Sequence, residues 1–402
     1  MKKFSYEAKD GATGKTIKSI VQAESEHAAA RLLIEQGYTP LDIKAEDESR
    51  GFIARLTGRI TTKDKIVFLR QLSTLIGAGL PLSQSLRTVA EQTGNKHMQE
   101  VVQEVIADVE GGRSLSGAFG KHPEVFDTII IALVTAGETS GTLDEALRRI
   151  AIQKEKDAAS ISKIRGAMIY PAIVLLVIVG VLLFMLLTIV PQVAKLYDDM
   201  NQSLPLLTAI MIATADFILG YWYIVLIILG IGGYFLAQYF DTDNGIKAKD
   251  TFKLNVPLFR GMFRKLYMAR FARTGQTLLT TGVAMLDMLH ISAEAVNNTI
   301  VSQSINRAAE KVKGGKSLSS SLAREEYILP MVHQMIRIGE QSGKVDEMMG
   351  KTAQVYEDEL DEEIKALTTT IEPVLMVIMA IMAGGMVGAV LFPIYSLVNN
   401  IK

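Results

Sequence analysis

Residues 137–141 read Gly-Glu-Thr-Ser-Gly, and residues 339–343 read Gly-Glu-Gln-Ser-Gly. The two stretches lie 202 positions apart in a chain of 402 residues. The same offset pairs other residues of the chain, namely Asp144 with Asp346, Glu145 with Glu347, Pro171 with Pro373 and Pro191 with Pro393. Similarity at one fixed offset is the sequence signature of a repeated structural unit. The sequence therefore predicts two copies of one domain.

The repeat also extends upstream of these stretches, where the offset becomes 203 after a single deletion. This offset pairs identical residues, among them Phe68 with Phe271, Arg70 with Arg273, Thr74 with Thr277, Leu75 with Leu278, Gly79 with Gly282 and Leu86 with Leu289. It also places Val109, Gly111, Gly112, Ser114, Leu115 and Ser116 on Val312, Gly314, Gly315, Ser317, Leu318 and Ser319. One offset with a single gap over more than 120 positions indicates an internal duplication.

Three apolar runs carry no charged residue: 172–190, 218–240 and 374–398. About 20 apolar residues in a helix cross the hydrocarbon core of a bilayer. These runs also explain how a chain with 21% charged residues has a mean hydropathy of +0.25. The sequence predicts three transmembrane helices.

The first and third runs each end one copy of the repeat, whereas the second belongs to neither copy. Two repeats that each end by leaving the cytoplasm can share one side of the membrane only if a third span brings the chain back. Basic residues flank the inner ends of the first two spans: Lys154, Lys156, Lys163 and Arg165 before the first, and Lys247, Lys249, Lys253 and Arg260 after the second. By the positive-inside rule, the N-terminus is cytoplasmic and the C-terminus extracytoplasmic. The N-terminus has no apolar stretch typical of a secretory signal.

We expect a mainly α membrane protein in which each repeat is a helical bundle. Within the first copy, a helical stripe of apolar residues over 65–76, Gly111-Gly112 as a helix end and Thr142 as a helix start indicate about six helices. The first 45 residues differ, because alternating residues near Phe4, Ile17 and Leu41 predict strands and Ser25 a helix start. The expected segments are a small α+β module (1–45), a linker (46–61), bundle copy 1 (62–170), transmembrane helix 1 (171–191), an extracytoplasmic loop (192–217), transmembrane helix 2 (218–240), bundle copy 2 (241–373) and transmembrane helix 3 (374–398).

The composition argues against several classes of function. The chain has no cysteine, which excludes disulfides and zinc sites that use sulfur, and its net charge of −1 disfavours a nucleic-acid binder. Gly314-Gly315-Lys316-Ser317 resembles the end of a phosphate-binding loop, but Glu310 stands where that motif requires a glycine. We therefore expect no catalytic, cofactor or metal site, and no enzyme.

Two sets of residues are candidates for interaction. The paired turn motifs contribute Gly137, Glu138, Ser140 and Gly141 with their counterparts Gly339, Glu340, Ser342 and Gly343. Their acids could stabilise a helix end, contact a partner or hold a cation, and the sequence leaves these alternatives open. The third apolar run contributes Ala380, Gly384 and Gly388, whose spacing lets transmembrane helices approach closely, within the chain or between protomers.

In these motifs the chain resembles the type II secretion system F family, also called GspF/PilC. The resemblance covers nearly the whole chain. It rests on the tandem domains, the order of the spans and four short motifs: Gly-Ala-Gly-Leu-Pro-Leu at 77–82, the paired Gly-Glu-x-Ser-Gly stretches, Tyr170-Pro171 and Glu372-Pro373. The second copy departs from the first at 280–285, where the proline is missing.

The resemblance implies an inner-membrane platform protein of a type IV pilus or type II secretion machine. Such a platform couples a cytoplasmic assembly ATPase, which is hexameric, to the extraction of pilins and the growth of a filament. The implied partners are that ATPase, pilin or pseudopilin subunits, other inner-membrane components of the machine, the lipid bilayer and further copies of the chain. Pilus, secretion and competence machines all remain open, as does the number of protomers. A transporter or channel built from a duplicated unit is the alternative, and the uncharged spans disfavour it.

Overall fold

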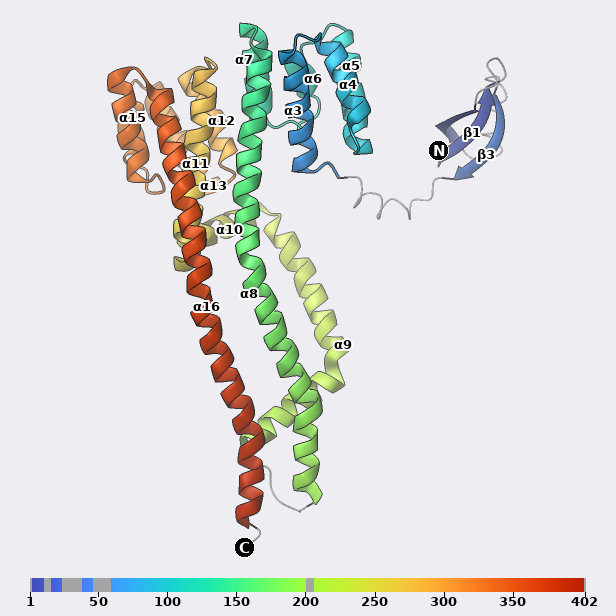
Figure 1. Ribbon diagram of the computed structural model, residues 1–402, viewed down its shortest axis with the longest axis vertical. Coiled ribbons are helices and arrows are strands. Elements are labelled where there is room, and N and C mark those ends of the chain that lie inside the picture. The colour runs from blue at the N-terminus through green and yellow to red at the C-terminus, as the bar shows by residue number, and fades with distance from the viewer. Residues whose placement is uncertain (1, 11–15, 24–37, 46–58, 200–205, 401–402) are drawn as a thin grey trace.

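The computed structural model describes residues 2–10, 16–23, 38–45, 59–199 and 206–400 of the chain (Figure 1). Near the N-terminus, strands β1 (Lys2–Asp10), β2 (Thr16–Ala23) and β3 (Tyr38–Ala45) form an antiparallel sheet in the order β2-β1-β3. The helix expected after Ser25 and most of the expected linker lie outside the described residues. The α+β character of this module therefore stays a prediction.

The first bundle begins where the sequence predicts it. Its helices are α3 (Thr62–Gly77), α4 (Leu82–Gln92), α5 (Lys96–Glu110), the short α6 (Leu115–Phe119), α7 (Thr128–Ser140) and the start of α8 (Leu143–Asp199). Polar side chains cap several of them by accepting hydrogen bonds from amides of the first turn, as Asn95 does for α5 and Ser114 for α6. At α3 the cap is reciprocal, because Thr61 and Asp64 each bond the other's backbone amide.

The second bundle repeats this order of elements. Its helices are α11 (Pro257–Thr280), α12 (Met285–Ala295), α13 (Thr299–Lys313), α14 (Leu318–Leu322), α15 (Pro330–Ser342) and the start of α16 (Val345–Asn400). A further helix, α10 (Asp243–Asn255), leads into the bundle and packs on α11 and α13. The duplication predicted from the sequence is thus confirmed at the level of the helices.

The two cores use equivalent positions and compensate for their differences. Phe68 and Phe271 are both buried at the same position of α3 and α11. Gly275 replaces Leu72, and Met349 replaces Leu147 on the facing helix. A Cβ atom at Gly275 would lie 2.9 Å from the Met349 sulfur, so the larger methionine occupies the volume that the leucine side chain would need.

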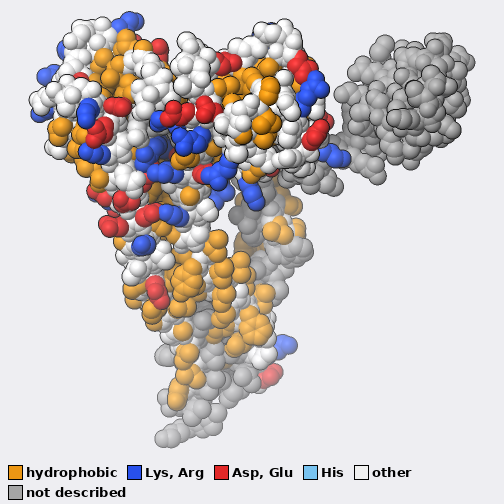
Figure 2. All heavy atoms as spheres, turned by 45° about the horizontal axis from the view of Figure 1, so that its top comes forward, with side chains coloured by type: hydrophobic (Ala, Val, Ile, Leu, Met, Phe, Trp, Pro, Cys, Tyr) orange, Lys and Arg blue, Asp and Glu red, His pale blue; other side chains and the backbone are white. Residues whose placement is uncertain are grey.

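Helices α8 and α16 run from the bundles straight into the apolar segments and lie side by side (Figure 1). Pro171 and Pro191 lie inside α8 and do not end it. Among the described residues, two stretches are long and apolar enough to cross a membrane: Leu143–Ile189 and Val345–Gly385. Figure 2 shows charged side chains over the bundles and an apolar surface along these helices.

The region between these two helices differs from the expectation. The predicted loop 192–217 is wrong for most of its length, because α8 continues to Asp199 and α9 (Leu206–Phe240) begins twelve residues before the expected span. Proline removes one helical hydrogen bond but can kink a helix without ending it, and Gln192, Ala194, Lys195 and Leu196 after it are good helix formers. Helix α9 also bends at Tyr221, directly after Gly220. The structure therefore does not show the predicted second span, 218–240, as one straight helix.

Candidate partner-contact sites

Glu138 binds the start of the short helix α6. Its carboxylate accepts hydrogen bonds from the backbone amides of Leu115 at 2.5 Å and Ser116 at 3.2 Å, and from the Ser116 hydroxyl at 2.5 Å. A carboxylate is favoured here because the first amides of a helix have no partner within it and carry partial positive charge. The sequence identified this residue, but it did not identify α6 as its partner.

Glu340 repeats the arrangement in the second bundle. It accepts from the amides of Leu318 at 2.6 Å and Ser319 at 3.3 Å, and from the Ser319 hydroxyl at 2.5 Å. The three contacts that join α15 to α14 are thus the same as those that join α7 to α6. Because the contacts recur, they belong to the architecture of the repeat unit.

The glycines of the motif shape the turn into the next helix. Gly141 and Gly343 end α7 and α15 in the left-handed region, at φ of 75° and 73°, where glycine avoids the strain of a side chain. Gly137 and Gly339 allow close approach of the following helix, since a Cβ at Gly137 would lie 2.7 Å from that of Ala146. The hydroxyls of Ser140 and Ser342 each donate to a carbonyl one turn back, at 2.8 Å.

These contacts support the interpretation of the motif as a local structural device. Each of its named residues has a partner or a steric role within its own bundle. In the parts of the chain that the structure describes, no group of three His, Cys, Asp or Glu side chains could hold a metal ion. Contact of the motif with a partner protein stays a prediction.

The third-span residues Ala380, Gly384 and Gly388 lie on α16 and are exposed. A Cβ at either glycine would meet no atom within 4 Å. At Gly384 and Gly388 the described structure therefore shows no close packing against another helix of the chain. Packing between protomers stays a prediction.

A polar network that the sequence analysis missed joins the two bundles. Gln153 of α8 donates to the Thr274 hydroxyl of α11 at 2.8 Å, and both side chains are buried. One turn along, Asp157 lies 3.6 Å from Arg270. The carboxylate of Glu357 on α16 accepts two hydrogen bonds of 2.8 Å from Arg273. It also accepts one of 2.8 Å from Lys156 of α8. The copies are thereby held by hydrogen bonds and ion pairs.

The ionisation of this network follows from its surroundings. Burial raises the pKa of Asp157, and the neighbouring Arg270 acts against that rise without cancelling it. Burial also acts to raise the pKa of Glu357, but hydrogen bonds from Arg273 and Lys156 outweigh it and hold that pKa below its usual value. Glu357 is therefore a stable anion at the centre of the contact.

Nearer the membrane the contact continues with an ion pair and an apolar patch. Lys163 of α8 lies 2.6 Å from Asp361 of α16. Ile164 and Ala167 of α8 pack against a buried cluster from α11 and α16, made of Met262, Leu266, Leu360 and Ile364. The interface thus combines ion pairs with a buried apolar cluster, and the apolar cluster lies at the end nearer the membrane.

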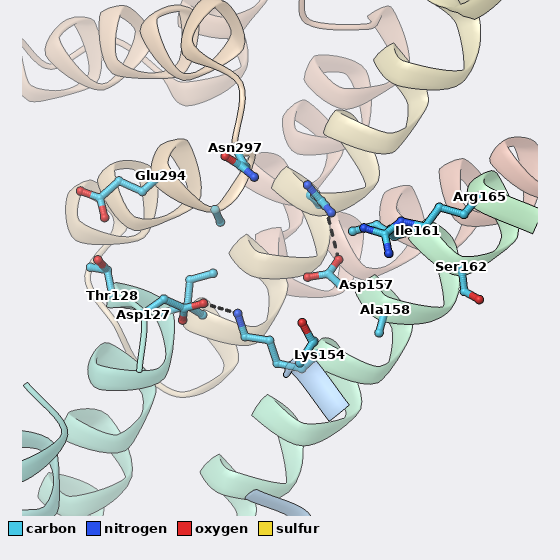
Figure 3. A pocket seen from close by; sticks show the side chains of 14 residues that line it. Asp127, Thr128, Lys154, Asp157, Ala158, Ile161, Ser162, Arg165, Glu294 and Asn297 are labelled. Atoms are coloured by element: carbon cyan, nitrogen blue, oxygen red, sulfur yellow. Dashed lines mark hydrogen bonds and ion pairs between the residues drawn. The ribbon is translucent and has the colours of Figure 1, made fainter. Parts of the chain in front are cut away.

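A cleft of 580 Å³ opens at the edge of this contact (Figure 3). Figure 3 shows Asp157 directed to an arginine of the other copy, and Asp127 paired with Lys154. The lining mixes both signs of charge, with Arg165 and Glu294 as further members. This mixture gives no preference for an anion or a cation, so the cleft is best described as the rim of the interface.

The sequence contained a signal for part of this network. Arg70 and Glu155 of the first copy are identical to Arg273 and Glu357 of the second, and they form the equivalent ion pair at 2.5 Å. The alignment of the copies could have identified this pair. It could not have identified Lys156 or Gln153, whose partners depend on how one copy packs on the other.

Two protein-family models match this chain. A model of the type II secretion system protein F matches residues 68–191 and 271–393, and a model of the N-terminal domain of protein F matches residues 1–44. The chain belongs to the type II secretion system protein F family. The two matches fall on the two bundles with their long helices, which confirms the repeat within this family.

Relatives in the family come from both kinds of machine. The chain is 36% identical to the type IV pilus assembly protein PilC of Thermus thermophilus, over 99% of both chains. It is 32% identical to the type IV pilus assembly protein TapC of Aeromonas hydrophila, over 96% of this chain and 93% of the relative. It is 33% identical to the type II secretion system protein F of Pseudomonas aeruginosa, over 99% of both chains. Identity to the pilus and secretion relatives thus lies in the same range, 32% to 36%.

Proposed function

We propose that this member of the protein F family is the inner-membrane platform of a type IV pilus or type II secretion machine. The single observation that carries the proposal is the similarity to type IV pilus assembly protein PilC and to type II secretion protein F over 99% of the chain. As a platform, the protein couples a cytoplasmic assembly ATPase to the extraction of pilin or pseudopilin subunits and their addition to a filament. It carries out no catalytic reaction of its own.

The long helices support a mechanical role. Helices α8 and α16 each belong to a bundle at one end and to an apolar segment at the other, with no loop between. A rotation or tilt of a bundle is therefore transmitted along a continuous helix into the membrane. Two such helices joined by ion pairs, including Lys163 with Asp361, move as one body.

The proposed topology has three spans, with α9 as the second, a cytoplasmic N-terminus and an extracytoplasmic C-terminus. The bases after α9, among them Lys247, Lys249 and Lys253, support the cytoplasmic side for the second bundle by the positive-inside rule. The polar contacts between the two bundles support the same side for both, since they could not form across a bilayer. Both bundles then offer related surfaces to one cytoplasmic partner, and the N-terminal module is a third candidate contact.

The test is binding of the full-length chain, in lipid nanodiscs, to the purified assembly ATPase from the same cell. We expect the ATPase to be retained with the nanodiscs, and retention to depend on its nucleotide state. Empty nanodiscs are the control for lipid binding. Failure of the ATPase to bind, with the platform folded, would contradict the coupling role. A deletion strain supplies the second readout, since it is expected to lose its filaments or its secretion and to regain them with the wild-type gene.

A further inference from the structure

Helix α10 is held closely against the end of α9. Thr242 lies at the turn between them, where its hydroxyl donates to the carbonyl of Tyr239 at 2.7 Å and accepts from the amide of Gly245 at 3.2 Å. A Cβ at Gly245 would overlap that same carbonyl oxygen, so only glycine permits the close approach. The direction of α10 is therefore fixed relative to the apolar helix that precedes it.

One face of α10 packs on the second bundle. Asp250 and Leu254 are buried, and the Asp250 carboxylate accepts hydrogen bonds from the amide and the hydroxyl of Thr299 on α13, at 2.8 and 3.1 Å. Lys253 is directed to the same side, since its ammonium lies 3.3 Å from Asp250 and over the ring of Phe263. These contacts define the inner face of α10, and the opposite side of the helix is its outer face.

The outer face of α10 carries an aromatic side chain with a lysine on either side. At about 3.6 residues per turn, Phe252 lies opposite the buried residues of the inner face, and it is 63% exposed. Ala248, one turn before it, is exposed as well. Lys247 and Lys249 flank these two residues and are exposed, and neither forms an ion pair within the part of the chain that the structure describes. An apolar strip between two uncompensated positive charges is thus presented away from the bundle.

This face lies at the level where the apolar segments begin. Figure 1 shows α10 at the foot of the second bundle, beside the end of α9, with α13 above it in the body of the bundle. The outer face of α10, opposite α13, is therefore directed toward the apolar end of the molecule. The last turn of α9 ends in the exposed rings of Tyr239 and Phe240. Aromatic side chains of this kind gather where a membrane meets water, and Phe252 extends that band onto α10.

We propose that α10 lies in the headgroup layer of the cytoplasmic leaflet and binds anionic phospholipid. Phe252 inserts among the upper acyl chains, and Lys247 and Lys249 pair with the lipid phosphates. A helix in this position is stable when its apolar side chains face the hydrocarbon and its lysines extend to the headgroups. Each lysine close to such a surface favours anionic lipid by about fivefold. The inference rests on the topology of the proposed function, in which α9 is a span that ends on the cytoplasmic side.

Lipid bound at α10 gives the second bundle an attachment to the membrane that is separate from its own long helix α16. Because α10 packs on α11 and α13, a force on its outer face is transmitted directly to that bundle. The attachment opposes tilting of the second bundle about α16. In the described structure the first bundle has no counterpart of α10, since α3 is its first helix. The two copies are therefore held differently at the membrane surface.

The test is lipid quenching at single cysteines in the full-length chain, which has no cysteine of its own. Ala248→Cys carries a fluorophore and leaves Phe252 and both lysines in place. The chain is placed in nanodiscs of equal phosphatidylglycerol and phosphatidylcholine, with bromine on the acyl chains of one lipid or of the other. Brominated chains quench only a fluorophore that lies in or next to the bilayer. We expect quenching at position 248, and stronger quenching by brominated phosphatidylglycerol.

Two further positions calibrate the signal. Ile381→Cys places the fluorophore at an exposed residue in the apolar part of α16, where we expect the two lipids to quench alike. Ile338→Cys places it at an exposed residue of α15, in the body of the second bundle, where we expect no quenching.

Variants around the label separate charge from apolar insertion. Lys247→Gln with Lys249→Gln is expected to lower the preference for phosphatidylglycerol by about fivefold per lysine. Phe252→Gln is expected to weaken quenching by both lipids. Lys313→Gln with Lys316→Gln is the matched control, because it removes two exposed lysines at the far end of α13 that also form no ion pair in the described structure. This control is expected to keep the preference.

The outcomes decide between lipid and other partners. The proposal is overturned if position 248 is not quenched while position 381 is, which would leave the outer face of α10 to a protein partner. It is also overturned if the two lipids quench position 248 equally. Absence of quenching at both positions overturns the proposed topology together with this inference. Binding of the ATPase to nanodiscs is read independently, so a failure of lipid binding is distinguished from a failure of coupling.

Discussion

Glu325 occupies in the second bundle the place that His122 occupies in the first, and the charges around the two residues are inverted with them. Glu325 accepts hydrogen bonds from Arg307 at 2.6 Å and from Lys311 at 2.7 Å. His122 instead lies 3.5 Å from Glu104, the counterpart of Arg307. The counterpart of Lys311 is Asp108, so both basic partners have become acidic. The duplicated unit thus surrounds equivalent positions with basic residues in the second bundle and with acidic residues in the first.

Glu325→Gln is expected to reduce the acid sensitivity of the second bundle. Burial acts to raise the pKa of Glu325, but hydrogen bonds from Lys311 and Arg307 outweigh it and lower that pKa below 4.5. A lowered pKa stabilises the fold above the unfolded value, about pH 4.5, and this contribution disappears as the pH falls through the folded value. We expect the variant to lose about 1.5 kcal/mol near pH 7 and to converge with the wild type as the pH falls through the folded-state pKa of Glu325.

The measurement is unfolding of the detergent-solubilised chain between pH 3 and pH 7, taken as the difference between variant and wild type. Glu326→Gln is the control, because it removes a neighbouring charge that has no such pair of basic partners in the described structure. An identical pH dependence for Glu325→Gln and wild type would contradict the prediction.

Glu138→Gln is expected to loosen α6 from α7. The glutamine keeps one carbonyl oxygen but loses the charge and the second acceptor, so part of the bonding to Leu115 and Ser116 is lost. A cap of this kind contributes about 1 kcal/mol. Hydrogen exchange should show faster exchange at the Leu115 and Ser116 amides. Glu340→Gln should repeat the effect at Leu318, and unchanged exchange at both sites would refute the capping role.

Gly339→Ala is expected to destabilise the second bundle by more than Gly343→Ala. A Cβ at Gly339 would lie 2.7 Å from the Val345 Cα, so the two helices must separate, whereas Gly343 has open space but a positive φ of 73°. The cost of the positive φ alone is about 1 kcal/mol. Gly94→Ala is the matched control, since it has open space and no positive φ. Thermal unfolding measures all three variants, and equal losses at 339 and 94 would rule out the close approach.

The sequence predicted the features of the fold that recur in both copies and those that depend only on neighbouring residues. The glycines at 111 and 141 marked helix ends because their backbone geometry is a local property, and the common offset identified the two bundles. The pairing of Gln153 with Thr274 was beyond reach, because it depends on how one bundle packs on the other. The loop prediction over 192–217 failed for a related reason. It treated Pro191 as a helix end, although the helical preference of the residues that follow was sufficient to continue α8.

Arg273→Ala is expected to cost more stability than Arg70→Ala, although the two arginines are equivalent in the repeat. Arg273 pairs with Glu357 inside the contact between the bundles, and its loss leaves a largely buried carboxylate with Lys156 as its remaining basic partner. We expect about 2 kcal/mol for this change. Arg70 and Glu155 are more exposed, and a surface pair contributes about 0.5 kcal/mol. Unfolding of the monodisperse chain in detergent measures both variants. Equal losses would mean that burial in the contact between the bundles adds nothing to the Arg273–Glu357 pair.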